Sequence, residues 1–93
     1  MVVDIAEVRI VSFETRESKN GEFVSLRVRQ GERTAFVSAF DAGSIDGEAV
    51  VLPLLAGGEQ RFAAGDLVTI RVRVGAYKNA KGAWASYTLQ GVA

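Results

Sequence analysis

The sequence predicts an all-β fold, a small closed barrel of five antiparallel strands. Apolar and polar residues alternate with a period of two through much of the chain, as they do in half-buried strands. Sustained helical periodicity is hard to find. Short turn sequences separate most of the alternating segments, and one much longer connection separates the third segment from the fourth. These observations together favour an antiparallel barrel over a helical or mixed fold.

The first two predicted strands cover residues 3–13 and 23–29, and the Asn20-Gly21 pair between them is a typical hairpin turn. In the second strand the even-numbered positions are apolar, whereas the odd-numbered positions are mostly polar or basic. Side chains on a strand alternate between its two faces, so one face of this strand is expected to lie in the core. The opposite face is expected to carry Arg27 and Arg29 into solvent.

The third predicted strand, residues 34–40, has two faces of similar hydrophobicity. One face holds two alanines and a valine, and the other holds Phe36, a serine and Phe40. Large aromatic side chains are usually buried, which favours a core position for the two phenylalanines. The smaller residues, however, suit the narrow interior of a small barrel, and this packing would leave both rings outside. Both orientations remain open from the sequence.

The fourth and fifth predicted strands cover residues 67–74 and 83–92 and are joined by a turn that contains two lysines. The fourth strand is expected to direct its valines and isoleucine inward and Arg71 and Arg73 outward. In the fifth strand, polar residues share the even-numbered positions with Trp84. Exposure of this tryptophan is therefore favoured over a core position.

The connection between the third and fourth strands, residues 41–66, is rich in glycine, and Pro53 interrupts its apolar run. A full helix is therefore not expected there. Five strands whose only long connection follows the third are typical of the OB-fold, a Greek-key barrel. An SH3-like barrel or an open β-sandwich also uses five strands, but neither favours the long connection at this point as clearly. We predict a single OB-fold domain spanning residues 1–93.

The composition excludes several kinds of chemistry. The 93 residues include neither cysteine nor histidine, so the chain forms no disulfide, no thiolate or imidazole metal site and no histidine-based catalytic triad. Its carboxylates show no metal-ligand spacing. We therefore expect a protein that is not an enzyme and that uses no cofactor, metal or small-molecule substrate. The longest apolar stretch is too short for a membrane helix and the N-terminus lacks a basic start, so an intracellular protein without a membrane partner is expected.

Charge is unevenly distributed, although eleven basic and eleven acidic residues cancel overall. Residues 41–66 hold five acidic residues and one arginine, whereas residues 67–93 hold four basic residues and no acidic one. Alternating charges are an ordinary way to keep a strand soluble, but solubility is better served by mixed signs. The basic residues that we expect to contact phosphates are Arg27, Arg29, Arg71, Arg73, Lys78 and Lys81.

Aromatic residues occur beside these cations. Single-stranded nucleic acid offers unpaired bases that stack on aromatic rings, which a duplex hides. Tyr77 lies near the tip of the last predicted hairpin, where it either stacks on a base or braces the two strands. Phe13 and Phe62 are assigned to packing. The candidate stacking residues are Phe36, Phe40, Tyr77 and Trp84.

The order and spacing of several segments resemble single-stranded DNA-binding proteins of the bacterial and phage OB-fold type. These segments are residues 13–21, residues 34–40, the Gly-Asp-x-Val-x-Ile sequence at residues 65–70 and the lysine hairpin within residues 77–87. The resemblance covers nearly the whole chain. It implies that aromatic residues of the third strand and the last hairpin stack on bases, and that arginines of the second and fourth strands meet phosphates.

Two departures from that family concern the end of the chain and the long connection. The chain ends at Ala93, directly after the fifth strand, whereas the bacterial proteins continue into a linker with an acidic tail. The segment at residues 50–58 replaces the usual helix and resembles the compact dimeric proteins of filamentous phages. The resemblance thus implies a protein of a bacterial cell or a phage-infected host, located in the cytoplasm.

The expected function is binding of single-stranded DNA with little sequence preference, in replication, recombination or phage propagation. The alternative is an OB-fold protein-interaction module, such as a primosome-like adaptor, that uses the apolar run at residues 50–55. That run either plugs the end of the barrel or forms a subunit interface, because so many consecutive apolar residues cannot all face one interior. A homodimer is the expected oligomer, with an interface formed by Val50, Val51, Leu52, Leu54 and Leu55.

Overall fold

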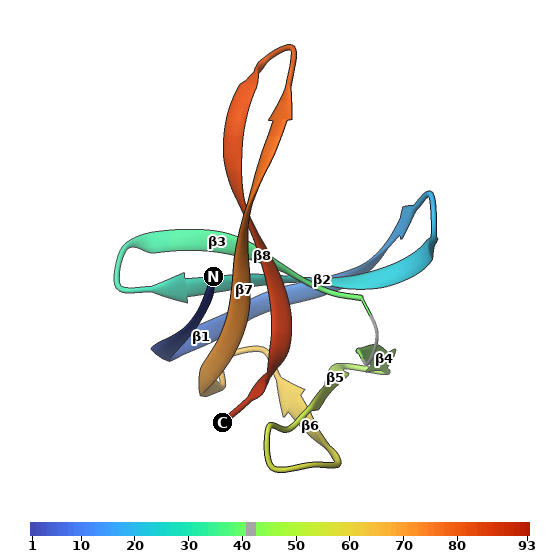
Figure 1. Ribbon diagram of the computed structural model, residues 1–93. Helices are drawn as coiled ribbons and strands as arrows, with labels where there is room; N and C mark the ends of the chain where they lie inside the picture. Colours follow the sequence, from blue (N-terminus) through green and yellow to red (C-terminus); the bar gives the residue numbers. More distant parts are fainter. Residues whose placement is uncertain (41–42) are drawn as a thin grey trace.

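The computed structural model describes residues 1–40 and 43–93, apart from the side chains of Tyr77, Asn79 and Trp84. The described residues form strands and turns without a helix, and therefore no helix that could cross a membrane (Figure 1). The predicted all-β fold is confirmed. The strands are β1 (Val2–Ser18), β2 (Gly21–Gln30), β3 (Arg33–Ala39), β4 (Ser44–Asp46), β5 (Ala49–Pro53), β6 (Glu59–Ala63), β7 (Leu67–Asn79) and β8 (Gly82–Val92).

Five of these strands close into a barrel in the order β1-β2-β3-β8-β7. Neighbouring strands are antiparallel except β3 and β8, which run parallel with Ser38 opposite Thr88. The predicted five-stranded barrel is confirmed, and its strand order is consistent with an OB-fold. The parallel pair closes the barrel, and the other four neighbouring pairs are antiparallel. A closed ring with an odd number of strands cannot alternate direction at every step, so one parallel pair is unavoidable.

Two hairpins extend beyond the barrel as arms (Figure 1). The ladder between β1 and β2 continues to Ser18 opposite Gly21, and the ladder between β7 and β8 continues to Asn79 opposite Gly82. Gly21 and Gly82 have φ angles of 118° and 139°, which a residue with a Cβ rarely adopts. Both turns fall where the sequence predicts them, but β1 and β7 are longer than predicted because cross-strand pairing continues to the turn.

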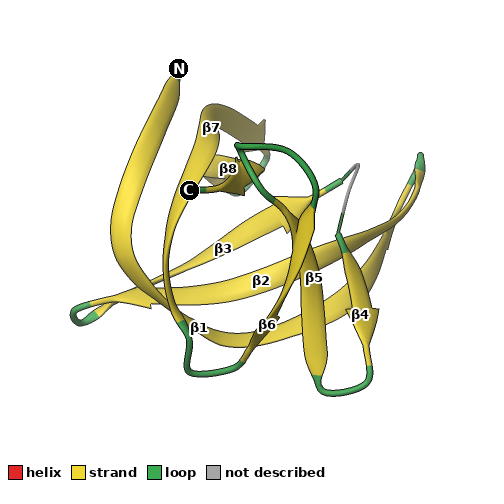
Figure 2. Cartoon of the chain, turned by 90° about the horizontal axis from the view of Figure 1, so that it is seen from below, coloured by secondary structure: helices red, strands yellow, loops and turns green. Residues whose placement is uncertain are grey.

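The connection between β3 and β7 contains no helix among its described residues, as the sequence predicts. It contains a three-stranded antiparallel sheet in the order β4-β5-β6, which lies at one end of the barrel (Figure 2). An ion pair between Asp46 and Arg61 joins the two outer strands of this sheet. Val50, Leu52 and Phe62 of the sheet belong to the same buried cluster as the barrel interior. The small sheet therefore covers one end of the barrel and shares its core.

The buried positions of β5 correct part of the predicted subunit interface. Val50 and Leu52 are 0% exposed and face the chain's own core, so neither can touch a partner. Alternation along β5 is the reason, since every second side chain of the strand points toward the barrel. Only the partly exposed members of the run could therefore contact a partner, either in the predicted homodimer or in the alternative adaptor function. These members are Val51, Leu54 and Leu55.

Candidate nucleic-acid interface

The orientation of β2 and β3 decides which aromatic side chains are available for binding. Leu26 of β2 lies opposite Val37 of β3, and both are 1% exposed. Because side chains alternate, the neighbouring positions on β3 point away from the core. Phe36 and Phe40 are accordingly 57% and 48% exposed. Of the two orientations left open by the sequence, the structure has the one with both rings outside.

A bulge in β1 brings a third strand into this surface. The register between β1 and β2 shifts between Ile10 and Ser12, where β1 has one residue more than its partner. Before the bulge Val8 and Ile10 face the core, whereas after it Phe13 packs against the core. Even-numbered residues of β1 beyond the bulge therefore point outward, beside the exposed residues of β2.

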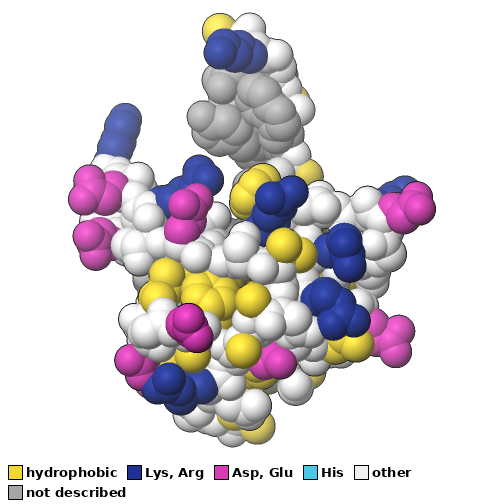
Figure 3. All heavy atoms as spheres, turned by 180° about the vertical axis from the view of Figure 1, so that it is seen from behind, with side chains coloured by type: hydrophobic (Ala, Val, Ile, Leu, Met, Phe, Trp, Pro, Cys, Tyr) yellow, Lys and Arg dark blue, Asp and Glu magenta, His cyan; other side chains and the backbone are white. Residues whose placement is uncertain are grey.

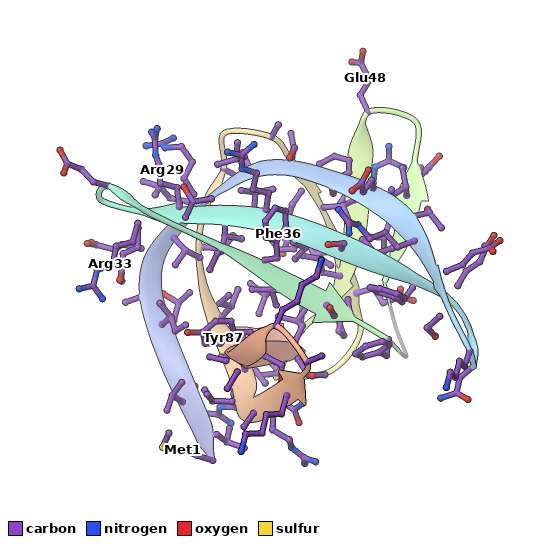
Figure 4. All side chains as sticks on the ribbon, turned by 90° about the horizontal axis from the view of Figure 1, so that it is seen from above. Met1, Arg29, Arg33, Phe36, Glu48 and Tyr87 are labelled. Atoms are coloured by element: carbon purple, nitrogen blue, oxygen red, sulfur yellow. The ribbon has the colours of Figure 1, made fainter. Side chains whose placement is uncertain are left out.

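Strand register aligns the outward side chains of β1, β2 and β3 in rows. Each row runs across the three strands. In one row the rings of Phe23 and Phe40 are in contact, with centroids 4.8 Å apart. Arg29 lies two residues beyond Arg27 on β2, opposite Thr34 of β3, and extends this surface. Figure 4 labels Phe36 and Arg29 on neighbouring strands. We call the following residues the outer face: Ser12, Arg27 and Phe36; Glu14, Ser25 and Ser38; Arg16, Phe23 and Phe40.

The centre of the outer face is a depression, because its middle row contains small serines. Ser25 is only 6% exposed although it points outward, and it lines a pocket together with larger side chains. A pocket of about 290 Å³ lies here, with Phe36 as its aromatic wall. In the view of Figure 3, apolar side chains are exposed among basic and acidic ones. The pocket is lined by Ser12, Phe13, Glu14, Arg16, Ser25, Arg27 and Phe36.

Charged side chains around the pocket form a defined arrangement. Arg16 donates from Nε to Oε1 of Glu14 at 2.9 Å, and its second contact to the same oxygen, from Nη2, is 2.7 Å long. The Cζ of Arg16 also lies 5.9 Å from the centroid of the Phe36 ring, within cation–π range. Arg27 forms no ion pair with any residue that the structure describes. The sequence interpretation missed Arg16 and Glu14 because it ended the first strand at Phe13.

The predicted phosphate contacts of β7 lie on another side of the molecule. In the ring of five strands, β7 is separated from β2 by β1 and from β3 by β8. Arg71 and Arg73 point outward from β7, as predicted, but away from the outer face. Arg71 is also held by Asp4, with Nε 2.7 Å from Oδ1 and Nη2 3.2 Å from Oδ2. The structure thus does not bring these two arginines together with Arg27 and Arg29.

The β7–β8 hairpin carries the remaining predicted residues. Lys78 and Lys81 are exposed near its tip. Tyr77 lies opposite Trp84 in the ladder, but the side chains of both are outside the described part of the structure. The predicted stacking roles of Tyr77 and Trp84 therefore stay predictions.

The ion pair between Asp4 and Arg71 predicts a specific pH dependence of stability. The hydrogen bond from Arg71 lowers the pKa of Asp4 below its ordinary value of 3.8. A carboxyl with a lowered folded-state pKa stabilises the protein above its unfolded pKa, and this contribution is lost as the pH falls through the folded pKa. Asp4→Asn is expected to lower the free energy of unfolding slightly at pH 7 and not at all at strongly acidic pH. Urea unfolding across pH measures this, and a difference that stays constant would contradict it.

Together, the fold and the outer face define a class of protein, an OB-like barrel with an exposed aromatic and basic surface. No protein family, curated protein or solved structure matches the chain. Among the described residues no group of three potential metal ligands lies together. What the outer face offers chemically is flat rings for stacking and guanidinium groups for anions.

Proposed function

We propose that this protein binds single-stranded DNA on the outer face, by stacking of bases on phenylalanine rings and by contacts between arginines and phosphates. The observation that carries the proposal is the exposure of Phe36 and Phe40 beside Arg27 and Arg16. Exposed phenylalanine rings leave apolar area in water, and stacking with a base would cover it. A duplex hides its base faces, so single strands are the expected ligand.

The position of the outer face in the barrel supports the same proposal. OB-folds bind oligonucleotides on the surface of strands 2 and 3 and on the loops after strands 1 and 4. In this barrel those elements are β2, β3, the turn between β1 and β2, and the turn between β7 and β8. Lys19, Lys78 and Lys81 lie at these two turns and are exposed. A strand lying over the aromatic rings would thus have basic arms near it for its phosphates.

Fluorescence anisotropy with labelled oligonucleotides tests the proposal. A mixed-sequence single strand of about 15 nucleotides is expected to bind, and the binding is expected to weaken as salt rises because cations are released from the phosphates. A duplex of equal length is expected to bind much more weakly. Absence of binding to the single strand at low salt would overturn the proposal, as would tighter binding to the duplex.

The salt dependence of DNA affinity is expected to distinguish arginines of the outer face from those on β7. Each phosphate contact to a single strand contributes about 0.7 to the slope of log affinity against log salt concentration. Arg27→Ala is expected to reduce the slope by about this amount. Arg71→Ala is expected to leave the slope unchanged, because Arg71 is held by Asp4 on another side of the barrel. Equal reductions in both variants would contradict the assignment of the binding surface.

A further inference from the structure

Glu14 is the acidic residue in the outer face, and its negative charge opposes phosphate binding there. It lies opposite Ser25 in the middle row and lines the pocket beside Phe36. A carboxylate accepts hydrogen bonds and donates none when ionised. Its useful partner in a nucleic acid is therefore a base N–H group rather than a phosphate.

The two oxygens of the Glu14 carboxylate have different environments. Oε1 accepts both contacts from Arg16, at 2.9 Å and 2.7 Å. Oε2 accepts no hydrogen bond from any residue that the structure describes. Arg16 therefore orients the carboxylate and leaves one oxygen available at the pocket.

The space between Arg16 and Phe36 suits a stacked base after a small movement. The Cζ of Arg16 lies 5.9 Å from the Phe36 ring centroid. A flat base between the guanidinium and the ring would need about 7 Å, which is two contacts of ~3.5 Å each. A shift of Arg16 by about 1 Å is therefore enough to admit a base as the middle layer of the stack.

Base chemistry then determines which bases the free oxygen of Glu14 accepts. Cytosine, adenine and guanine each carry an exocyclic amino group that donates hydrogen bonds. Thymine and uracil carry a carbonyl oxygen where cytosine has its amino group. Their one donor on this edge, N3–H, lies between two carbonyl oxygens whose lone pairs would repel the carboxylate. The carboxylate therefore favours an amino-bearing base over thymine or uracil.

We propose that the pocket beside Phe36 selects a base with an exocyclic amino group, which donates to Oε2 of Glu14 while the base stacks on Phe36. This inference rests on the proposed function and refines it. Binding would be tolerant of sequence along most of the strand but selective at one position. It also means that oligothymidine is a poor probe of this protein's full affinity.

The test compares homopolymers of deoxycytidine and deoxyuridine, because the two bases are pyrimidines that differ at the amino and carbonyl groups. Homopolymers of about 15 nucleotides offer the pocket the same base in every register. Anisotropy at pH 7.5 and fixed salt is expected to give about fivefold to tenfold tighter binding to the deoxycytidine strand. Equal affinity for both strands would overturn this inference while leaving the proposed function intact. Binding to neither strand would overturn the proposed function itself.

Glu14→Gln and Glu17→Gln form a matched pair of variants. Each removes one negative charge from β1, so the general electrostatic gain in binding is expected to be similar for the two variants. The glutamine amide at position 14 both accepts and donates, so the preference for deoxycytidine is expected to fall to about equality. Glu17 lies at an odd position beyond the bulge, away from the pocket, and its variant is expected to keep the preference. A preference that survives in Glu14→Gln would overturn the role of Glu14.

Discussion

Replacing Phe36 by alanine is expected to weaken binding of single-stranded DNA by roughly 5- to 150-fold, the range that corresponds to stacking of one base on an aromatic ring. The ring is 57% exposed and forms the aromatic wall of the pocket in the outer face. Its removal also deprives Arg16 of its cation–π contact. Little apolar area is lost from the core, so the thermal midpoint is expected to stay within a few degrees of wild type. Anisotropy titration and thermal unfolding of the same preparation measure both quantities.

Leu67→Ala is the control for loss of exposed apolar surface. Leu67 is 58% exposed at the start of β7, which is not a neighbour of β2 or β3 in the barrel. Its truncation is expected to change affinity by less than about twofold, because a surface contact outside the site contributes little. Wild-type affinity in Phe36→Ala would contradict the proposed site. A loss of the same size in both variants would indicate nonspecific binding through exposed apolar groups.

The barrel could be predicted because its signals are local. Alternation along β2 and β7 specifies a strand with one buried face, and the Asn20-Gly21 pair specifies the hairpin between β1 and β2. The orientation of β3 could not be predicted, because its two faces have similar hydrophobicity. Pairing decides it, since Val37 must lie opposite the buried Leu26 of the neighbouring strand.

The missed parts of the site have a different origin, a bulge of one residue. Val11 is the additional residue in β1, and it moves Phe13 to the inner face and Glu14 to the outer face. Both Val11 and Phe13 are apolar, so the sequence does not reveal at which residue the core-facing positions change from even to odd numbers. The predicted strand therefore ends at Phe13 and does not include Glu14 and Arg16.

Long-range strand pairing explains why the predicted role of Arg71 in phosphate binding differs from its position in the structure. Asp4 and Arg71 are 67 residues apart in the sequence, and only the pairing of β1 with β7 brings them together. The basic C-terminal part of the chain therefore has a nearby acid that its composition does not reveal. The strands β4, β5 and β6 are three to five residues long, too short for alternation to distinguish them from a glycine-rich loop.

The second large effect concerns this small sheet. Leu52→Ala is expected to lower the free energy of unfolding by about 2–5 kcal/mol, as truncation of a buried leucine generally does. Leu52 is 0% exposed and lies in the cluster that includes Val8, Ile10 and Leu26 of the barrel. A small domain has about 5–15 kcal/mol of stability in total, so the loss is a large fraction of it. Urea unfolding followed by circular dichroism measures the change.

Leu55→Ala distinguishes a core role of the apolar run from an interface role. Leu55 is 37% exposed, so its truncation in a monomer is expected to cost less than half of the Leu52→Ala effect. A subunit interface, by contrast, makes the thermal midpoint rise with protein concentration, because association stabilises the folded state by mass action. A midpoint that depends on concentration in wild type, and loses this dependence in Leu55→Ala, would assign Leu55 to a homodimer contact. If the thermal midpoint of wild type does not depend on protein concentration, the apolar run is explained by core packing of Val50 and Leu52 rather than by a subunit interface.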